Sequence, residues 1–153
     1  MESKIYLGID PGVSGAAVVI CKGKVLRMID FTNPSEVIAQ LNEVLDFVSV
    51  DLAGLEKVGP APGQGGRSIF TFGENYGWWQ GVLLSLNIPY QLVNPLQWQK
   101  GLVPKKKAKT DRPQLPVARR LFPKAELHLK KHHDRASALM IAHFVQRFDE
   151  NRL

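Results

Sequence analysis

The sequence has few of the features that would cross-link the chain or hold it in a membrane. Cys21 is the only cysteine among 153 residues, so an internal disulfide and a cysteine-rich zinc site are both excluded. No apolar run reaches the roughly eighteen residues of a membrane helix. The opening residues, MESKIYLG, lack the cationic and then apolar order of a signal peptide. Repeats and low-complexity tracts are missing too. We therefore expect one soluble domain over residues 1–153 that stays in the cytoplasm.

Negative charge is scarce in one segment. Residues 1–99 hold six Lys or Arg and nine Asp or Glu, residues 100–131 hold eleven and two, and residues 132–153 hold three of each. The net charge of +6 therefore comes from a segment that contains Lys100, Lys105, Lys106, Lys107, Lys109, Arg112, Arg119, Arg120, Lys124, Lys130 and Lys131. An even spread would keep the surface soluble equally well, so the clustering favours a polyanion, above all nucleic acid.

The stretch 4–20, KIYLGIDPGVSGAAVVI, places a carboxylate at the end of an expected strand. Its residues alternate between two faces, one with Ile5, Leu7 and Ile9 and the other with Tyr6, Gly8 and Asp10. A Pro-Gly pair then ends the strand. Because Asp before Pro-Gly often only opens a turn, Asp10 needs other acids beside it to count as a site residue.

Periodicity and turn residues predict an alternation of strands and helices. We expect strands near 5–10, 16–20, 24–31, 50–58 and 88–93, and helices near 33–47, 74–86, 95–98, 113–122 and 133–148. The first three strands follow one another closely, which is typical of an antiparallel meander. The fourth carries Glu56 in an otherwise apolar setting, and Glu56 is equally well explained as an exposed strand-end residue.

The segment 59–73, GPAPGQGGRSIFTFG, is rich in Gly and Pro and predicts a mobile surface loop. Phe70 and Phe72 within it either fold down onto the core or stack on an unpaired base, with Arg67 on the nucleic-acid backbone. The expected helix after this loop is apolar over much of its circumference, which favours a dimer interface formed by Tyr76, Trp78, Trp79, Val82 and Leu83.

The expected last helix opens with His133 and Asp134 and is largely apolar afterwards. A carboxylate in a first turn also suits the helix dipole, so Asp134 has a structural explanation as well. Ser137 lies three residues on, on the same face. The spacing of the four histidines does not predict a pair of metal ligands. His133, next to Asp134, is the one histidine that we keep as a candidate.

Several motifs together resemble the RuvC family of Holliday junction resolvases, especially its compact phage-type branch. They are GIDPG at Asp10, LEKV at Glu56, SIFTFGENYG, IPYQLVNPLQWQK, ARRLFP and HHDRASALMIA, and they run from Ile5 to about Ala142. The resemblance implies an α/β, ribonuclease H-like fold with a five-stranded mixed sheet, whose first three strands are antiparallel, flanked by helices. It also implies a homodimer that makes paired nicks in branched DNA, chiefly four-way junctions.

The same resemblance implies two divalent ions, Mg²⁺ or Mn²⁺, in each active site. Asp10 would bridge them, with Glu56 and Asp134 completing the set, and hard cations of this kind prefer oxygen ligands. Clustered carboxylates repel one another unless a cation lies among them. The DNA would be gripped by basic residues, with a phenylalanine opening the junction centre; the candidates are Arg67, Phe70, Phe72, Lys105, Lys106, Lys107, Lys109, Arg112, Lys130 and Lys131.

Ser137 departs from the family pattern, which has a second acid at this position of the last helix. Serine cannot supply a charged ligand. Either three carboxylates suffice, helped by His133 or water, or the site is impaired, naturally or by design, and the chain binds junctions without cleaving them. Another ribonuclease H-like activity, on RNA–DNA hybrids or transposon ends, is a third alternative.

Overall fold

The computed structural model describes residues 2–153 and contains a five-stranded mixed sheet in the order β3-β2-β1-β4-β5. The strands are β1 (Ile5–Asp10), β2 (Ala16–Cys21), β3 (Lys24–Asp30), β4 (Leu52–Glu56) and β5 (Tyr90–Val93). β1 pairs with β2 and β2 with β3 in antiparallel fashion, whereas β1–β4 and β4–β5 are parallel. The sheet thus has the expected strand number and the expected antiparallel start.

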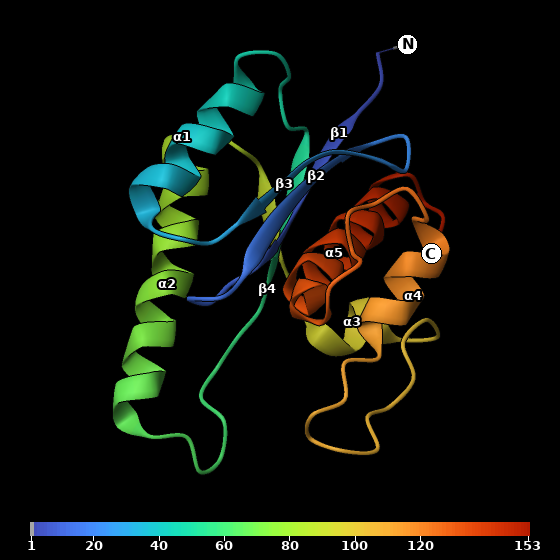
Figure 1. Ribbon diagram of the computed structural model, residues 1–153. Coiled ribbons are helices and arrows are strands. Elements are labelled where there is room, and N and C mark those ends of the chain that lie inside the picture. Colours follow the sequence, from blue (N-terminus) through green and yellow to red (C-terminus); the bar gives the residue numbers. More distant parts are fainter. Residues whose placement is uncertain (1) are drawn as a thin grey trace.

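Helices cover both faces of the sheet (Figure 1). They are α1 (Pro34–Leu45), α2 (Gly66–Ser85), α3 (Pro95–Gln99), α4 (Gln114–Leu121) and α5 (His133–Asp149), with a 3₁₀ turn η1 (Lys130–His132) before α5. α1 and α2 lie on one face, and α3, α4 and α5 lie on the other. Within residues 2–153, no helix has the length and hydrophobicity needed to cross a membrane.

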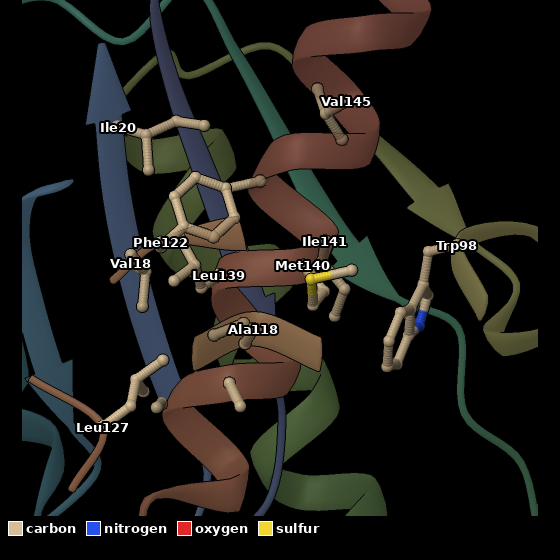
Figure 2. Packing of buried hydrophobic residues seen from close by; sticks show 14 of the residues in the cluster. Val18, Ile20, Trp98, Ala118, Phe122, Leu127, Leu139, Met140, Ile141 and Val145 are labelled. Carbon is tan, nitrogen blue, oxygen red and sulfur yellow. The ribbon is translucent and has the colours of Figure 1, made fainter. Parts of the chain in front are cut away.

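The alternation along β1 separates two hydrophobic cores. Ile5, Leu7 and Ile9 pack with residues of α1 and α2. Tyr6, on the opposite face, packs with the cluster built around α4 and α5, part of which is seen in Figure 2. The predicted facing of this strand is therefore confirmed, and Asp10 belongs to the α5 side of the sheet.

The loop predicted over 59–73 is shorter than expected, because α2 begins at Gly66. The prediction of a flexible segment around Phe70 and Phe72 is therefore wrong, since both lie on a helix. Their surroundings differ: Phe70 is 69% exposed, whereas Phe72 is half-buried beside Tyr76. Glycines are typical of a loop, but packing of the neighbouring side chains stabilises the helix through them.

The broad apolar surface of α2 is largely used within the chain. Trp79, Val82 and Leu83 are 1%, 7% and 0% exposed and pack against the sheet and α1. Burial within one chain therefore accounts for these three positions without a dimer. Tyr76 and Trp78 are half-buried at the margin of the same cluster, and their part in a dimer stays a prediction.

Candidate active site

Two of the three predicted acids come together because β1 and β4 are parallel neighbours. Gly8 pairs with Gly54, and the next pair is Ile9 with Leu55. Asp10 and Glu56 follow one residue later, and each lies two positions beyond its glycine. Since side chains alternate along a strand, each acid projects from the same face as its glycine, at the same end of the sheet.

Helix α5 lies against this glycine pair and brings the third acid. A β-carbon at Gly8 would be 2.0 Å from the Ala138 carbonyl oxygen, and one at Gly54 would be 2.4 Å from a side chain of α5, so only glycine permits the approach. Asp134 precedes Ala138 by one helical turn, about 6 Å. Asp10 follows Gly8 by two strand residues, also about 6–7 Å. The two displacements are similar in length, so Asp134 lies beside Asp10.

The electrostatics reflect this convergence. Burial raises the pKa of Asp10 well above its usual range, and the negative charges of Glu56 and Asp134 and a hydrogen bond with Asp134 raise it further. Burial also raises the pKa of Glu56 and of Asp134. The three carboxyl groups therefore share one poorly solvated site in which a second or third negative charge is costly.

Glu56 and Asp134 each have a nitrogen of an aromatic side chain as a close partner. The indole N–H of Trp98 donates to Oε2 of Glu56 at 2.6 Å and partly offsets the effect of burial on the pKa of that carboxyl. His133 Nδ1 lies 3.2 Å from Oδ1 of Asp134, and it opposes the rise in the pKa of Asp134. These contacts restrict the orientation of both carboxyl groups.

Ser137 occupies the Glu56 side of the site. Its hydroxyl donates to the His133 carbonyl oxygen at 3.1 Å and accepts from the Gln114 side-chain amide at 3.3 Å. Ser137, Gln114 and Glu56 line one cavity of about 610 Å³. The position at which the resemblance expects an acid therefore faces the site but holds a neutral, hydrogen-bonded pair.

The basic segment lies beside this cavity. Lys105 and Lys106 line it, and the candidate residues of the loop are at least partly exposed, namely Lys105, Lys106, Lys107, Lys109 and Arg112. Asp111 shapes the loop by accepting hydrogen bonds from the backbone N–H groups of Lys107 and Ala108 at 2.9 and 2.8 Å. Positive charge is thereby held next to the buried acids.

Solved structures share this architecture. Thermus thermophilus RuvC has a TM-score of 0.65 at 20% identity, with 95% of this chain and 96% of that chain covered. A structure of T. thermophilus RuvC in complex with Holliday junction substrate has a TM-score of 0.64 at 18% identity over the same shares. The chain has the RuvC fold. The fowlpox virus Holliday junction resolvase shares it too, with a TM-score of 0.57 at 14% identity, covering 96% of this chain and 99% of that one. No protein-family model and no curated protein sequence matches the chain.

The other predicted DNA-binding residues lie on two separate elements of the RuvC fold. Arg67 and Phe70 are exposed on the first turns of α2, and Phe72 is close to the turn after β1, since its ring lies 3.2 Å from where a β-carbon of Gly12 would be. Lys130 and Lys131 are exposed on η1, directly before α5. Their contacts with DNA stay predictions.

Three supporting residues were not predicted from the sequence. Asn75 is buried on α2, and its Oδ1 accepts the backbone N–H of Gly12 at 2.6 Å, which holds the turn that follows Asp10. Trp98 and Gln114 contact Glu56 and Ser137 respectively. Asn75 could have been noticed in the sequence, because it is a polar residue among the apolar residues of its helix. The other two were hidden, since they depend on contacts between distant segments.

The three carboxyl groups of the site are the kind of oxygen ligand that a hard divalent cation prefers. They converge, and the half-buried Asp10 has both of the others as negative neighbours, which is the environment that a bound cation would stabilise. In residues 2–153, however, no three His, Cys, Asp or Glu side chains are already arranged to hold one ion. Binding of an ion by all three would therefore require at least one of the carboxyl groups to turn toward the others.

Proposed function

We propose that this protein is a single-domain, metal-dependent endonuclease that cuts branched DNA, chiefly four-way junctions. The observation that carries this proposal is the meeting of Asp10, Glu56 and Asp134, from three distant segments, beside an exposed basic loop. The RuvC fold supports it, and so does the Holliday junction substrate bound by T. thermophilus RuvC, which has that fold. A nuclease of this kind would work in the cytoplasm, and in that of a bacterial host if the protein is phage-encoded.

The chain's residues divide the task by position. Asp10 forms the centre of the acid site, because the charges of both other acids act on it, while Glu56 and Asp134 flank it from a strand and a helix. The lysines of the loop 105–109 hold backbone phosphates and so set where the DNA lies without reading its sequence. Mg²⁺ or Mn²⁺ ions held by these carboxylates would supply an activated water and stabilise the charge on the leaving oxygen.

Paired nicks require two sites, so we propose that the protein acts as a homodimer. The half-buried Tyr76 and Trp78 on α2 are the aromatic residues of the predicted interface that stay accessible. A symmetric dimer would present its two acid sites to opposite strands of a four-way junction. A cross-link between α2 helices and a sedimentation measurement would test this arrangement directly.

A second candidate function is junction binding without cleavage. The observation that favours it is the neutral Ser137–Gln114 pair in the cavity beside Glu56. Serine adds no negative charge, so a site with three carboxylates would hold two ions less tightly than one with four. Contacts to DNA phosphates lie on other residues and would be unaffected.

The deciding experiment uses a labelled synthetic four-way junction with Mg²⁺, Mn²⁺ or EDTA. We expect symmetrical, metal-dependent nicks by the protein itself and none by Asp10→Asn. Asp46→Asn, at the end of α1, serves as the matched control and keeps full activity.

A Ser137→Asp variant separates the two functions. Cleavage by this variant alone, with equal junction binding by both proteins, would establish the protein as a binder with an incomplete site. If neither protein prefers the junction to a linear duplex, the proposed junction specificity is wrong. An RNA–DNA hybrid tested in parallel covers the remaining ribonuclease H-like alternative.

A further inference from the structure

Trp98 makes a short hydrogen bond to one of the three acids. Its indole N–H lies 2.6 Å from Oε2 of Glu56, and the residue is only 3% exposed. Figure 2 shows Trp98 at the margin of the packed cluster, beside the point where β4 ends. Burial of the indole limits the competition from water on the Trp98 side of this bond, and a bond to an ionised group is stronger than one between neutral partners.

The segment that carries Trp98 follows directly after the strand that pairs with Glu56. Glu56 pairs with Val93 at the end of β5, and α3 starts directly afterwards. Asn94 and Gln97 form a reciprocal capping box at the start of α3, which fixes how that helix leaves the strand. Trp98 is thereby held over the carboxyl group from the next strand.

We propose that Trp98 is a positioning residue for Glu56, and that it holds one carboxyl oxygen so that the other is presented to a divalent cation. The inference rests on the proposed metal-dependent nuclease function. A carboxylate whose rotation is already restricted loses less conformational freedom when it binds an ion, and partners of metal ligands commonly act in this way. Trp98 touches neither substrate nor the reacting atoms in this role.

The test removes the N–H group but keeps an aromatic ring, through Trp98→Phe. Trp79→Phe is the matched control, because Trp79 is also buried and its Nε1 has no hydrogen-bond partner within residues 2–153. Both variants lose similar volume, so both lower the melting temperature. Only Trp98→Phe should raise the Mn²⁺ concentration that half-saturates cleavage, by about tenfold or more, while junction binding in EDTA stays at the wild-type level.

Calorimetric titration with Mn²⁺ gives the same comparison without any cleavage step. We expect weaker Mn²⁺ binding by Trp98→Phe than by Trp79→Phe. Equal Mn²⁺ affinities in the two variants, alongside normal cleavage by the wild-type protein, would overturn the role of Trp98 and leave the proposed function standing. Absence of both Mn²⁺ binding and cleavage in the wild-type protein would instead overturn the proposed function.

A fluorescence measurement keeps the inference testable if Trp98→Phe does not fold. Trp98 is one of three tryptophans, so replacing Trp78 and Trp79 by Phe leaves it as the single indole emitter. Paramagnetic Mn²⁺ should then quench its emission at the Mn²⁺ concentration that half-saturates binding by the same variant in the calorimetric titration. Unchanged emission through a saturating titration would show that Trp98 does not lie beside the ions and would overturn the inference.

Discussion

Replacing Gly8 by Ala tests the contact that brings α5 to the sheet. The new β-carbon would lie 2.0 Å from the Ala138 carbonyl oxygen and 2.4 Å from the Ala142 amide nitrogen. Both atoms belong to helix backbone and cannot turn away as a side chain could. To restore ordinary separations, α5 must move away from β1 by roughly 1 Å or more.

The size of the effect follows from this displacement. Forcing an extra methyl group into a packed core costs about 1–3 kcal/mol, and more where backbone must move. A loss of about 3 kcal/mol corresponds to a melting temperature lower by roughly 6–12 °C for a protein of this size. Because Asp134 moves with the helix, a shift of about 1 Å relative to Asp10 should lower cleavage on the order of 100-fold.

Thermal unfolding and junction cleavage, measured on the same preparations, check both numbers. Gly77→Ala is the control, since a β-carbon at Gly77 meets nothing within 4 Å and the residue lies inside α2. There, alanine should stabilise by about 0.5–1 kcal/mol. A Gly8→Ala protein with the melting temperature and activity of the wild type would refute the claim that α5 rests on the glycine pair.

Three further outcomes are expected. Asp10→Asn should raise the melting temperature in EDTA, because a neutral amide avoids the repulsion from the neighbouring acids, and should remove any stabilisation by Mg²⁺; an unchanged melting temperature in EDTA would contradict this. Changing both Lys105 and Lys106 to Ala should reduce the dependence of log K on log salt by about 2 for junction binding, whereas Lys22→Ala, on the β2–β3 turn, should leave it unchanged. Both carboxylate oxygens of Asp30 accept hydrogen bonds from Arg135 of α5, at 2.7 and 2.6 Å, and this pairing lowers the pKa of the Asp30 carboxyl from its usual 3.8. Asp30→Asn should therefore lower the free energy of unfolding by about 0.5–1 kcal/mol at pH 7. In denaturation measured at a pH below the lowered pKa of the folded protein, this difference should vanish, because the carboxyl is then protonated in both the folded and the unfolded state.

The strand that carries Asp10 could be predicted because its information is local. Alternating side chains determine which residues face each core, and Pro-Gly ends the strand wherever it occurs. The start of α1 was equally clear, and Asn33 indeed caps it by accepting the N–H of Glu36 at 3.1 Å. Elements of this kind need no knowledge of the rest of the chain.

The beginning of α2 was missed because local and tertiary preferences disagree there. Gly65, Gly66 and Gly73 have low helix propensity, and their spacing is typical of a loop. In the structure, Ile69 and Phe72 are half-buried and line one small cavity together with Val58, and tertiary packing of this kind supplies most of the stability of a helix in a protein.

The acid site was predicted through resemblance rather than through pattern. Local sequence patterns left Asp10 and Asp134 with adequate structural explanations, as a turn residue and a helix-start residue. The contacts of Trp98 with Glu56 and of Gln114 with Ser137 join segments 42 and 23 residues apart. Neither spacing follows any repeat of a strand or helix, so no sequence pattern could reveal them.

The docking of α5 on Gly8 and Gly54 also determines which parts of the protein can open independently. Separating Asp134 from Asp10 requires the helix to leave the sheet, and most of α5 is buried in the core, so that opening approaches complete unfolding. The loop 103–110 has few buried side chains and can open on its own. Amide hydrogen exchange would accordingly divide the protein into a slow acid site and a fast cationic loop, and DNA could be gripped and released many times without disturbing the three carboxyl groups.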